Sequence, residues 1–275
     1  MPLDQIDVDS LPENGKEMSF LEHLEELRWH IIRSLVVIAV FSVISFINLD
    51  FLFEKVIFGP RYADFATYRF LCWFSHVAGL GEKICIQPAT SEVITTAIGE
   101  AFTMSLTVSI AIGLILAFPY MFWELWRFVR PGLKHGEAST ANRIILIGSV
   151  LFFTGVLFGY FVIAPAGINF LVGYKVAGVE NKSTLDSYIN YMLLFILPPG
   201  ATFEMPLVVY FLARFGLITA GFMRQYRRYA ILIVLVVAAI ITPGPDIMSQ
   251  LLVAVPLYLL YEASIAVAAK FYVKR

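Results

Sequence analysis

The sequence predicts an all-α protein that crosses a membrane several times, and two observations carry this prediction. Of the 275 residues, 59% are hydrophobic and only 15% are charged, and the mean hydropathy is +0.78. A soluble domain could not bury that much apolar side chain in one core. The apolar residues also fall into continuous windows of about 20 residues, the length that a helix needs to cross a bilayer. Alternation of polar and apolar residues over successive short segments, as in a membrane barrel, is not found in the sequence.

Six windows are predicted to be transmembrane helices of a single domain covering residues 19–275, after an acidic tail at 1–18. They lie at 31–49, 101–123, 144–166, 188–212, 229–242 and 251–269. The fifth, with about 14 residues and a rise of about 1.5 Å per residue, would be about 21 Å long against a hydrocarbon layer of about 30 Å. Pro243 and Pro245 block its continuation. Either the bilayer thins there, or protein shields the helix, or the helix extends beyond this window.

The distribution of Lys and Arg predicts the orientation. If the first residues are cytoplasmic, 14 of the 20 Lys and Arg residues lie on that side and six lie on the other. Because positive charge accumulates in cytoplasmic loops, both termini are expected in the cytoplasm. The opening stretch MPLDQIDVDSLPENGKE lacks the basic start of a signal peptide, so no cleaved leader is expected. The net charge of -1 gives no reason to expect nucleic acid as a partner.

The stretch SFLEHLEELRWHIIRS, which leads into the first window, holds the first candidate site residues. Glu25 lies three residues before Arg28 and Glu26 lies four before His30, so a local ion pair is the ordinary role for each glutamate. Since an imidazole is mostly neutral at pH 7, Glu26 is the less compensated of the two. We therefore expect Glu26 to be a receptor for an incoming cation.

The stretch AFPYMFWELWRFVRPGLKHGE, residues 117–137, leaves the second window and enters a cytoplasmic loop. Pro119 is expected to kink the helix, and Trp123 and Trp126 are expected at the membrane interface. Glu137 then lies at the same membrane level as Glu26. A loop glutamate is ordinarily just solvated, and that alternative stays open for Glu137.

Glu204 lies inside the fourth window, where a carboxyl costs about 2.5 to 3.5 kcal/mol on insertion scales. Pro198, Pro199 and Pro206 bracket it and predict a bent or interrupted helix. Its role is either a structural hydrogen bond to a neighbouring helix or a contact to a partner. A third possibility is the ion site of a proton- or cation-coupled secondary transporter. Against the transporter, the other half of the chain does not repeat this proline and glutamate pattern.

No reaction chemistry is indicated by the sequence. All four histidines, His23, His30, His76 and His135, lie outside the predicted helices, and the motifs HExxH and GxSxG do not occur. We therefore expect no enzyme activity, no metal site and no cofactor.

Several of these stretches, taken in order, resemble the TatC family, the core membrane subunit of the twin-arginine protein translocase. They are HLEELR at 23–28, FPYMFWELWRFVRPGL at 118–133 with a glutamate four residues later, GATFEMP at 200–206, and RRYAILIVLVVAAIITPGPDIMSQLLVAVPLYLLYE at 227–262. The resemblance covers residue 18 onward. It implies a cupped six-helix bundle in the bacterial cytoplasmic (inner) membrane. It further implies a receptor for Arg-Arg signal peptides of folded cargo, which associates with itself and with TatA, TatB or both.

The resemblance also assigns residues. It implies that Glu26 and Glu137 bind the paired arginines, whose planar guanidinium groups match a carboxylate better than lysine does. It implies that Glu204 and Gln250 offer polar contacts to partner transmembrane helices. The wider set of implied site residues comprises Glu25, Arg28 and Phe128 with the signal-peptide site, and Pro60, Pro119 and Asp246 with the intramembrane positions.

The chain departs from the family in three places. His30 stands where a basic residue is frequent, and small residues at 138–140 replace basic ones after Glu137. The loop at 50–87 is enlarged and rich in aromatic residues, and is expected either to lie on the membrane surface or to pack over the cup. Cys72 and Cys85 in that loop either form a disulfide or remain free thiols. A GxxxG pattern at 155–159 permits close helix packing but is too common in membrane helices to indicate a partner.

Overall fold

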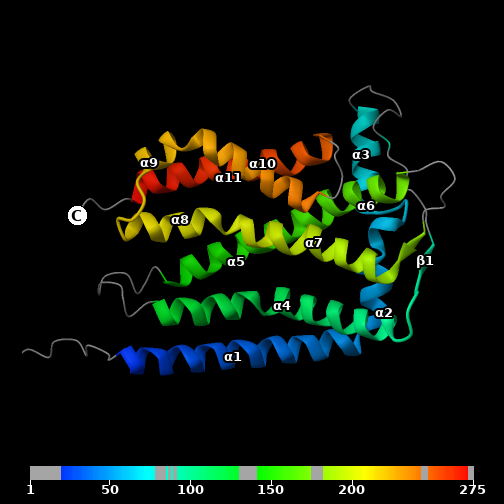
Figure 1. Ribbon diagram of the computed structural model, residues 1–275, viewed down its shortest axis with the longest axis horizontal. Coiled ribbons are helices and arrows are strands. Elements are labelled where there is room, and N and C mark those ends of the chain that lie inside the picture. The colour runs from blue at the N-terminus through cyan, green and yellow to red at the C-terminus, as the bar shows by residue number, and fades with distance from the viewer. Residues whose placement is uncertain are drawn as a thin grey trace, which may run out of the picture.

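The computed structural model describes residues 20–77, 85, 88, 92–129, 141–174, 182–242 and 247–271. Its long helices lie side by side along one direction (Figure 1). The chain enters along α1, Phe20–Ile47, which packs on α4, Glu100–Val129. α4 packs on α5, Ala141–Phe158, and α5 packs on α7, Leu185–Phe203. The last layer is formed by α10, Arg227–Ile241, and α11, Ile247–Phe271.

Five helical stretches are long and apolar enough to cross a membrane, within the described residues. They are Glu25–Ile47, Glu100–Phe128, Arg143–Gly173, Leu185–Arg214 and Gln250–Phe271. These match five of the six predicted windows, and the all-α class is confirmed. The predicted fifth window corresponds to α10, which has 15 residues and is therefore about 22 Å long. The predicted sixth window, 251–269, lies within α11, which has 25 residues and extends beyond the window at both ends.

Two of the membrane-crossing stretches are composite. α5 passes through a π-helical turn, Gly159–Ile163, into α6, Ala164–Gly173. α7 ends at Phe203 and α8, Met205–Arg214, begins directly after Glu204. The interruption that the prolines around Glu204 predicted is therefore present. α9, Ala220–Gln225, then leads into α10.

Close packing of the third and fourth crossings depends on the GxxxG glycines. A Cβ atom at Gly159 would lie 2.3 Å from the carbonyl oxygen of Phe195, and one at Gly155 would lie 2.6 Å from the carbonyl oxygen of Pro199. Any side chain would push the two helices apart. The sequence did not show what the GxxxG glycines pack against. In the structure they pack against another helix of the same chain.

Large apolar side chains are exposed along the helices. Leu35, Val36, Val43 and Ile47 on α1 all have more than half of their surface accessible, and α4, α5 and α10 have similar residues. A soluble monomer rarely exposes apolar surface on this scale. The exposed surface fits contact with lipid hydrocarbon.

One end of the bundle holds an irregular ledge. The ledge comprises α2 (Leu49–Phe51), a π-helical turn (Leu52–Ile57), a 3-10 turn (Gly59–Arg61) and α3 (Ala66–Val77). We call this the α3 end, and the opposite end, where α1 begins, the amino-terminal end. Two tyrosines fasten the ledge, because the hydroxyls of the half-buried Tyr160 and the buried Tyr188 donate to the carbonyls of Val56 and Ile57, each at 2.8 Å.

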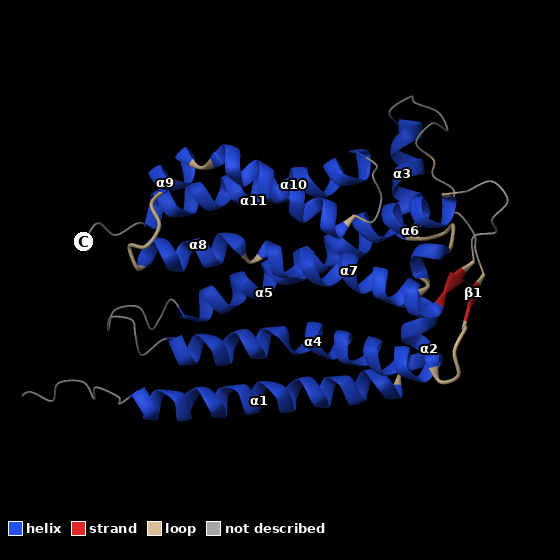
Figure 2. Ribbon diagram, viewed as in Figure 1, coloured by secondary structure: helices blue, strands red, loops and turns tan. Residues whose placement is uncertain are grey.

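A small parallel pairing also lies at the α3 end, which the all-α expectation did not include. β1, Val93–Ile94, pairs with β2, Ser183–Thr184 (Figure 2). The carboxylate of Glu100 holds the same region together. It accepts hydrogen bonds from the backbone N–H groups of Thr96 at 2.6 Å and Asp186 at 2.9 Å. The starts of α4 and α7 are thereby joined.

A disulfide joins Cys72 on α3 to Cys85, with Cα atoms 4.4 Å apart. Its removal in the double variant Cys72→Ser/Cys85→Ser is expected to lower the free energy of unfolding by about 3 kcal/mol, the loop-entropy value for a loop of this size. Thermal unfolding in detergent, with and without reductant, measures this change. Reductant should lower the midpoint of the wild-type protein and leave that of the variant unchanged. An unchanged wild-type midpoint would contradict the prediction.

Candidate functional site

Four polar side chains meet between α1 and α4 near the amino-terminal end. Glu26 and His30 lie one turn apart on α1, and Tyr120 and Glu124 lie one turn apart on α4. The two helices run side by side over their length (Figure 1). Residues separated by 94 positions in the sequence are thereby brought into contact.

Glu124 and His30 form the buried part of this cluster. Glu124 is 1% exposed and His30 is 6% exposed. His30 Nδ1 forms a hydrogen bond with Glu124 Oε2, and the Tyr120 hydroxyl donates to Glu124 Oε1 at 2.8 Å. A buried carboxylate is stable only when its oxygens have such partners. Because Nδ1 donates to Glu124, His30 turns its other ring nitrogen toward Glu26.

Glu26 forms the accessible part of the cluster. Its side chain is 35% exposed, and its Oε1 atom lies 3.9 Å from His30 Nε2. Its Oε2 atom is buried and has no hydrogen-bond partner among the described residues. The local contact considered from the sequence is thus present, but its two atoms lie beyond hydrogen-bond distance. Glu26 retains hydrogen-bonding capacity that no described group uses.

The other predicted members of this site fall into three groups. Phe128 lies edge-on to the His30 ring, with centroids 6.1 Å apart, so it belongs to the cluster. Glu25 and Arg28 are exposed, and the structure forms no salt bridge between these two described residues. Glu137 lies outside the described residues, so its predicted place beside Glu26 stays a prediction.

Glu124 is the residue that the sequence reasoning missed. It was noticed only as part of FWELW, whose tryptophans were interpreted as interface anchors. One signal was available: an acidic residue at the end of an apolar window must have a partner. That partner, His30, could be identified only from the packing of α1 on α4.

A second polar position lies where α7 meets α8. Both carboxylate oxygens of Glu204 are buried and lack a hydrogen-bond partner in the described part of the chain. The backbone of Phe152 on α5 lies nearby, without meeting hydrogen-bond geometry. Since a buried carboxylate without partners is costly, a proton or a hydrogen-bond donor from another group would stabilise Glu204.

The remaining intramembrane predictions occupy ordinary structural positions. The Gln250 side-chain amide donates to the Leu235 carbonyl at 3.0 Å and so joins α11 to α10. Pro60 is fully buried in the ledge, and Pro119 lies inside the continuous helix α4. Asp246 lies outside the described residues.

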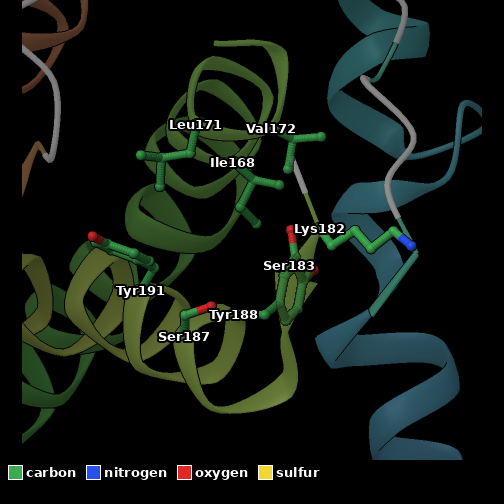
Figure 3. A pocket seen from close by; sticks show the side chains of 8 residues that line it. All are labelled: Ile168, Leu171, Val172, Lys182, Ser183, Ser187, Tyr188 and Tyr191. Carbon is green, nitrogen blue, oxygen red and sulfur yellow. The ribbon is translucent and has the colours of Figure 1, made fainter. Parts of the chain in front are cut away.

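A small cavity lies at the α3 end, far along the bundle from Glu26. It has a volume of about 160 Å³, below the size of typical small-molecule sites. Figure 3 shows Lys182 extending toward the neighbouring ledge. Because the cavity lies at the opposite end of the bundle, it is not part of the Glu26 site. Its walls are formed by Ile168, Leu171, Val172, Lys182, Ser183, Ser187, Tyr188 and Tyr191.

Comparison with known proteins gives consistent matches over most of the chain. The family described as "Sec-independent protein translocase protein (TatC)" matches residues 22–256. The TatC protein of Blattabacterium sp. subsp. Periplaneta americana is 36% identical over 261 residues, covering 94% of this chain and 97% of that protein. That of Carboxydothermus hydrogenoformans is 35% identical over 256 residues, covering 92% of this chain and 93% of that protein.

Solved structures agree with the sequence matches. A crystal structure of the twin arginine translocase receptor TatC is 31% identical and superimposes with a TM-score of 0.66, covering 90% of this chain and 98% of that one. A second, in DDM, is 32% identical with a TM-score of 0.69, covering 89% and 98%. Each match covers nearly the whole of this chain and of the matched protein. The resemblance to the TatC family that the short motifs indicated is therefore confirmed. This chain is therefore a membrane protein that belongs to the TatC family of Sec-independent protein translocase proteins.

Proposed function

We propose that this chain is a receptor for twin-arginine signal peptides and that Glu26 binds one of the two arginines. The observation that carries the proposal is the Oε2 atom of Glu26, which has no hydrogen-bond partner among the described residues although the side chain is reachable from solvent. The crystallised relatives are themselves named as the twin arginine translocase receptor.

The chemistry favours arginine over lysine at this position. A guanidinium presents parallel N–H donors that can pair with both oxygens of a carboxylate, whereas an ammonium is a point charge. Each charge-assisted hydrogen bond contributes about 1.5 to 3 kcal/mol. Because His30 is held by Glu124, Oε1 of Glu26 stays directed toward the imidazole. Oε2 is buried without a hydrogen-bond partner among the described residues, and the arginine would supply that partner on binding.

The proposal places the amino-terminal end of the bundle in the cytoplasm and the chain in the bacterial inner membrane. The excess of Lys and Arg on that side supports this orientation. So does the disulfide at the α3 end, since disulfides persist on the oxidising side of the membrane. Residues 1–18 would be a cytoplasmic tail, and residues 19–275 one six-helix domain in which α10 is the short fifth crossing.

We assign the second arginine to Glu137 and the partner contacts to Glu204 and Gln250. Glu137 follows the end of α4 by eight residues in the sequence, and the last turn of α4 holds Phe128 against His30. The unsatisfied carboxyl of Glu204 suits a polar group of a transmembrane helix from TatA or TatB. Self-association would use the exposed apolar helix faces. The short α10 fits a locally thinned bilayer, which would help folded cargo to cross.

Binding of a fluorescent Arg-Arg signal peptide to the protein in nanodiscs tests the receptor site. Glu26→Gln is expected to weaken binding at least tenfold, about 1.4 kcal/mol, because the amide cannot form the charge-assisted pair. Glu137→Gln should act in the same direction. A Lys-Lys peptide should bind the wild-type protein weakly.

The matched control is Glu54→Gln, which removes the same charge at the α3 end, where Glu54 is exposed and pairs with Lys55 at 2.9 Å. It should bind the Arg-Arg peptide as the wild type does. Equal affinity of the wild type and the Glu26 variant for both peptides would reject the site.

A further inference from the structure

α3 carries a stripe of exposed aromatic and aliphatic side chains that the proposed receptor function does not use. Phe70, Trp73, Phe74 and Val77 are 60%, 61%, 48% and 66% exposed. Their spacing of i, i+3, i+4 and i+7 puts all four on one face of the helix. An amphipathic helix with such a face requires an apolar environment on that side.

The opposite face of α3 is fastened to the ledge, so the helix cannot turn to bury this stripe. The Tyr68 hydroxyl donates to the Pro60 carbonyl at 3.0 Å, and burial raises the pKa of Tyr68 to about 12, which keeps this donor protonated. Ser75 is fully buried, and Cys72 is held by the disulfide to Cys85. The exposed stripe therefore has a fixed direction.

The placement of α3 relates this stripe to the bilayer. In Figure 1, α3 runs across the direction of the long helices and extends past α6. It lies at the end where α1 stops and where α4 and α7 begin. With the long helices along the membrane normal, as the proposed function has it, α3 would lie along the membrane surface at the level of the lipid headgroups.

We propose that α3 is an interfacial helix whose Phe70, Trp73, Phe74 and Val77 face inserts into the lipid leaflet at the α3 end. Aromatic residues, above all Trp, favour this depth of a bilayer, and helices with one apolar face lie in the interface plane. Arg69 is exposed one turn before Trp73, where a guanidinium can reach lipid phosphates.

The size of the stripe favours lipid over a protein partner. Four large side chains with these exposures present on the order of 400 Å². A stable protein interface needs about 800 Å² on each partner. A lipid surface requires no minimum area and surrounds the bundle at this level.

Trp73 fluorescence in nanodiscs tests the proposal. A protein in which Trp29, Trp123 and Trp126 are replaced by Phe reports Trp73 alone, and intact folding is checked by the disulfide and the thermal midpoint. Lipids brominated near the headgroup should quench Trp73 at least twofold more than lipids brominated at the chain ends. Iodide in the buffer should quench it weakly.

The variant Phe70→Ser/Phe74→Ser in the same background keeps Trp73 and the disulfide, and is expected to reduce quenching by lipid and increase quenching by iodide. Two results would overturn the proposal. Strong iodide quenching without lipid quenching in the single-Trp protein would place the stripe in water. Protection from both quenchers would show that protein covers it, for example a second copy of the chain.

Discussion

Replacing Glu124 by alanine is expected to lower the free energy of unfolding by about 3 to 5 kcal/mol. The substitution removes the partner of both His30 and Tyr120 at a position where the carboxylate is 1% exposed. The imidazole is then left buried with its Nδ1 donor unpaired, which is the costly outcome when one member of a buried pair is lost. Chemical unfolding in detergent, followed by tryptophan fluorescence, measures the change.

Glu262 provides a matched control for this measurement. It accepts a hydrogen bond from Tyr258 one turn earlier at 2.8 Å, as Glu124 does from Tyr120, and it pairs with Arg227 at 2.7 Å. Its side chain is 30% exposed, so solvent screens the pair. Glu262→Ala should therefore cost less than about 1 kcal/mol. Equal small losses in both variants would contradict the structural role of Glu124.

A second variant of Glu124 links the buried pair to the receptor site. Glu124→Gln keeps an acceptor for Tyr120 but removes the charge that orients His30. If the pair positions Glu26, the affinity for the Arg-Arg peptide should fall in this variant, although residue 124 is too deeply buried to touch the peptide. Unchanged affinity together with a lower unfolding free energy would show that Glu124 acts on stability alone.

Replacing Glu204 by leucine is expected to have the opposite effect on stability. Its carboxyl oxygens are buried without hydrogen bonds to the described residues, so an apolar side chain of similar size should raise the free energy of unfolding by about 1 kcal/mol or more. Residues retained at such a cost usually serve function. Co-purification and site-directed cross-linking with the partner subunits should fall at least tenfold.

Gln250→Leu is the control for Glu204→Leu. This change removes the hydrogen bond to the Leu235 carbonyl and should lower the unfolding free energy by about 1 kcal/mol. A loss of stability in Glu204→Leu would mean that Glu204 makes a structural hydrogen bond. Proton uptake by liposomes that depends on Glu204 would instead support the secondary-transporter alternative.

Helix positions followed from composition, whereas helix ends did not. Apolar windows located every long helix, because the bilayer demands about 20 apolar residues wherever a chain crosses. The ends were less accurate. α4 continues to Val129, well past the predicted end at 123, because the helix includes the charged residues Glu124 and Arg127, which a window of uninterrupted apolar residues excludes. The ledge and α3 were predicted only as an enlarged aromatic loop.

The class of the protein, its family and one half of the candidate site follow from the amino-acid sequence alone. Hydropathy indicated the membrane, and the motifs around Glu26 and Glu204 indicated the family, because these are properties of short contiguous stretches. Only the tertiary structure showed that Glu124 lies against His30 and that the aromatic stripe of α3 points away from the bundle. Both depend on which helix faces which, and that is decided by packing between residues far apart in the chain.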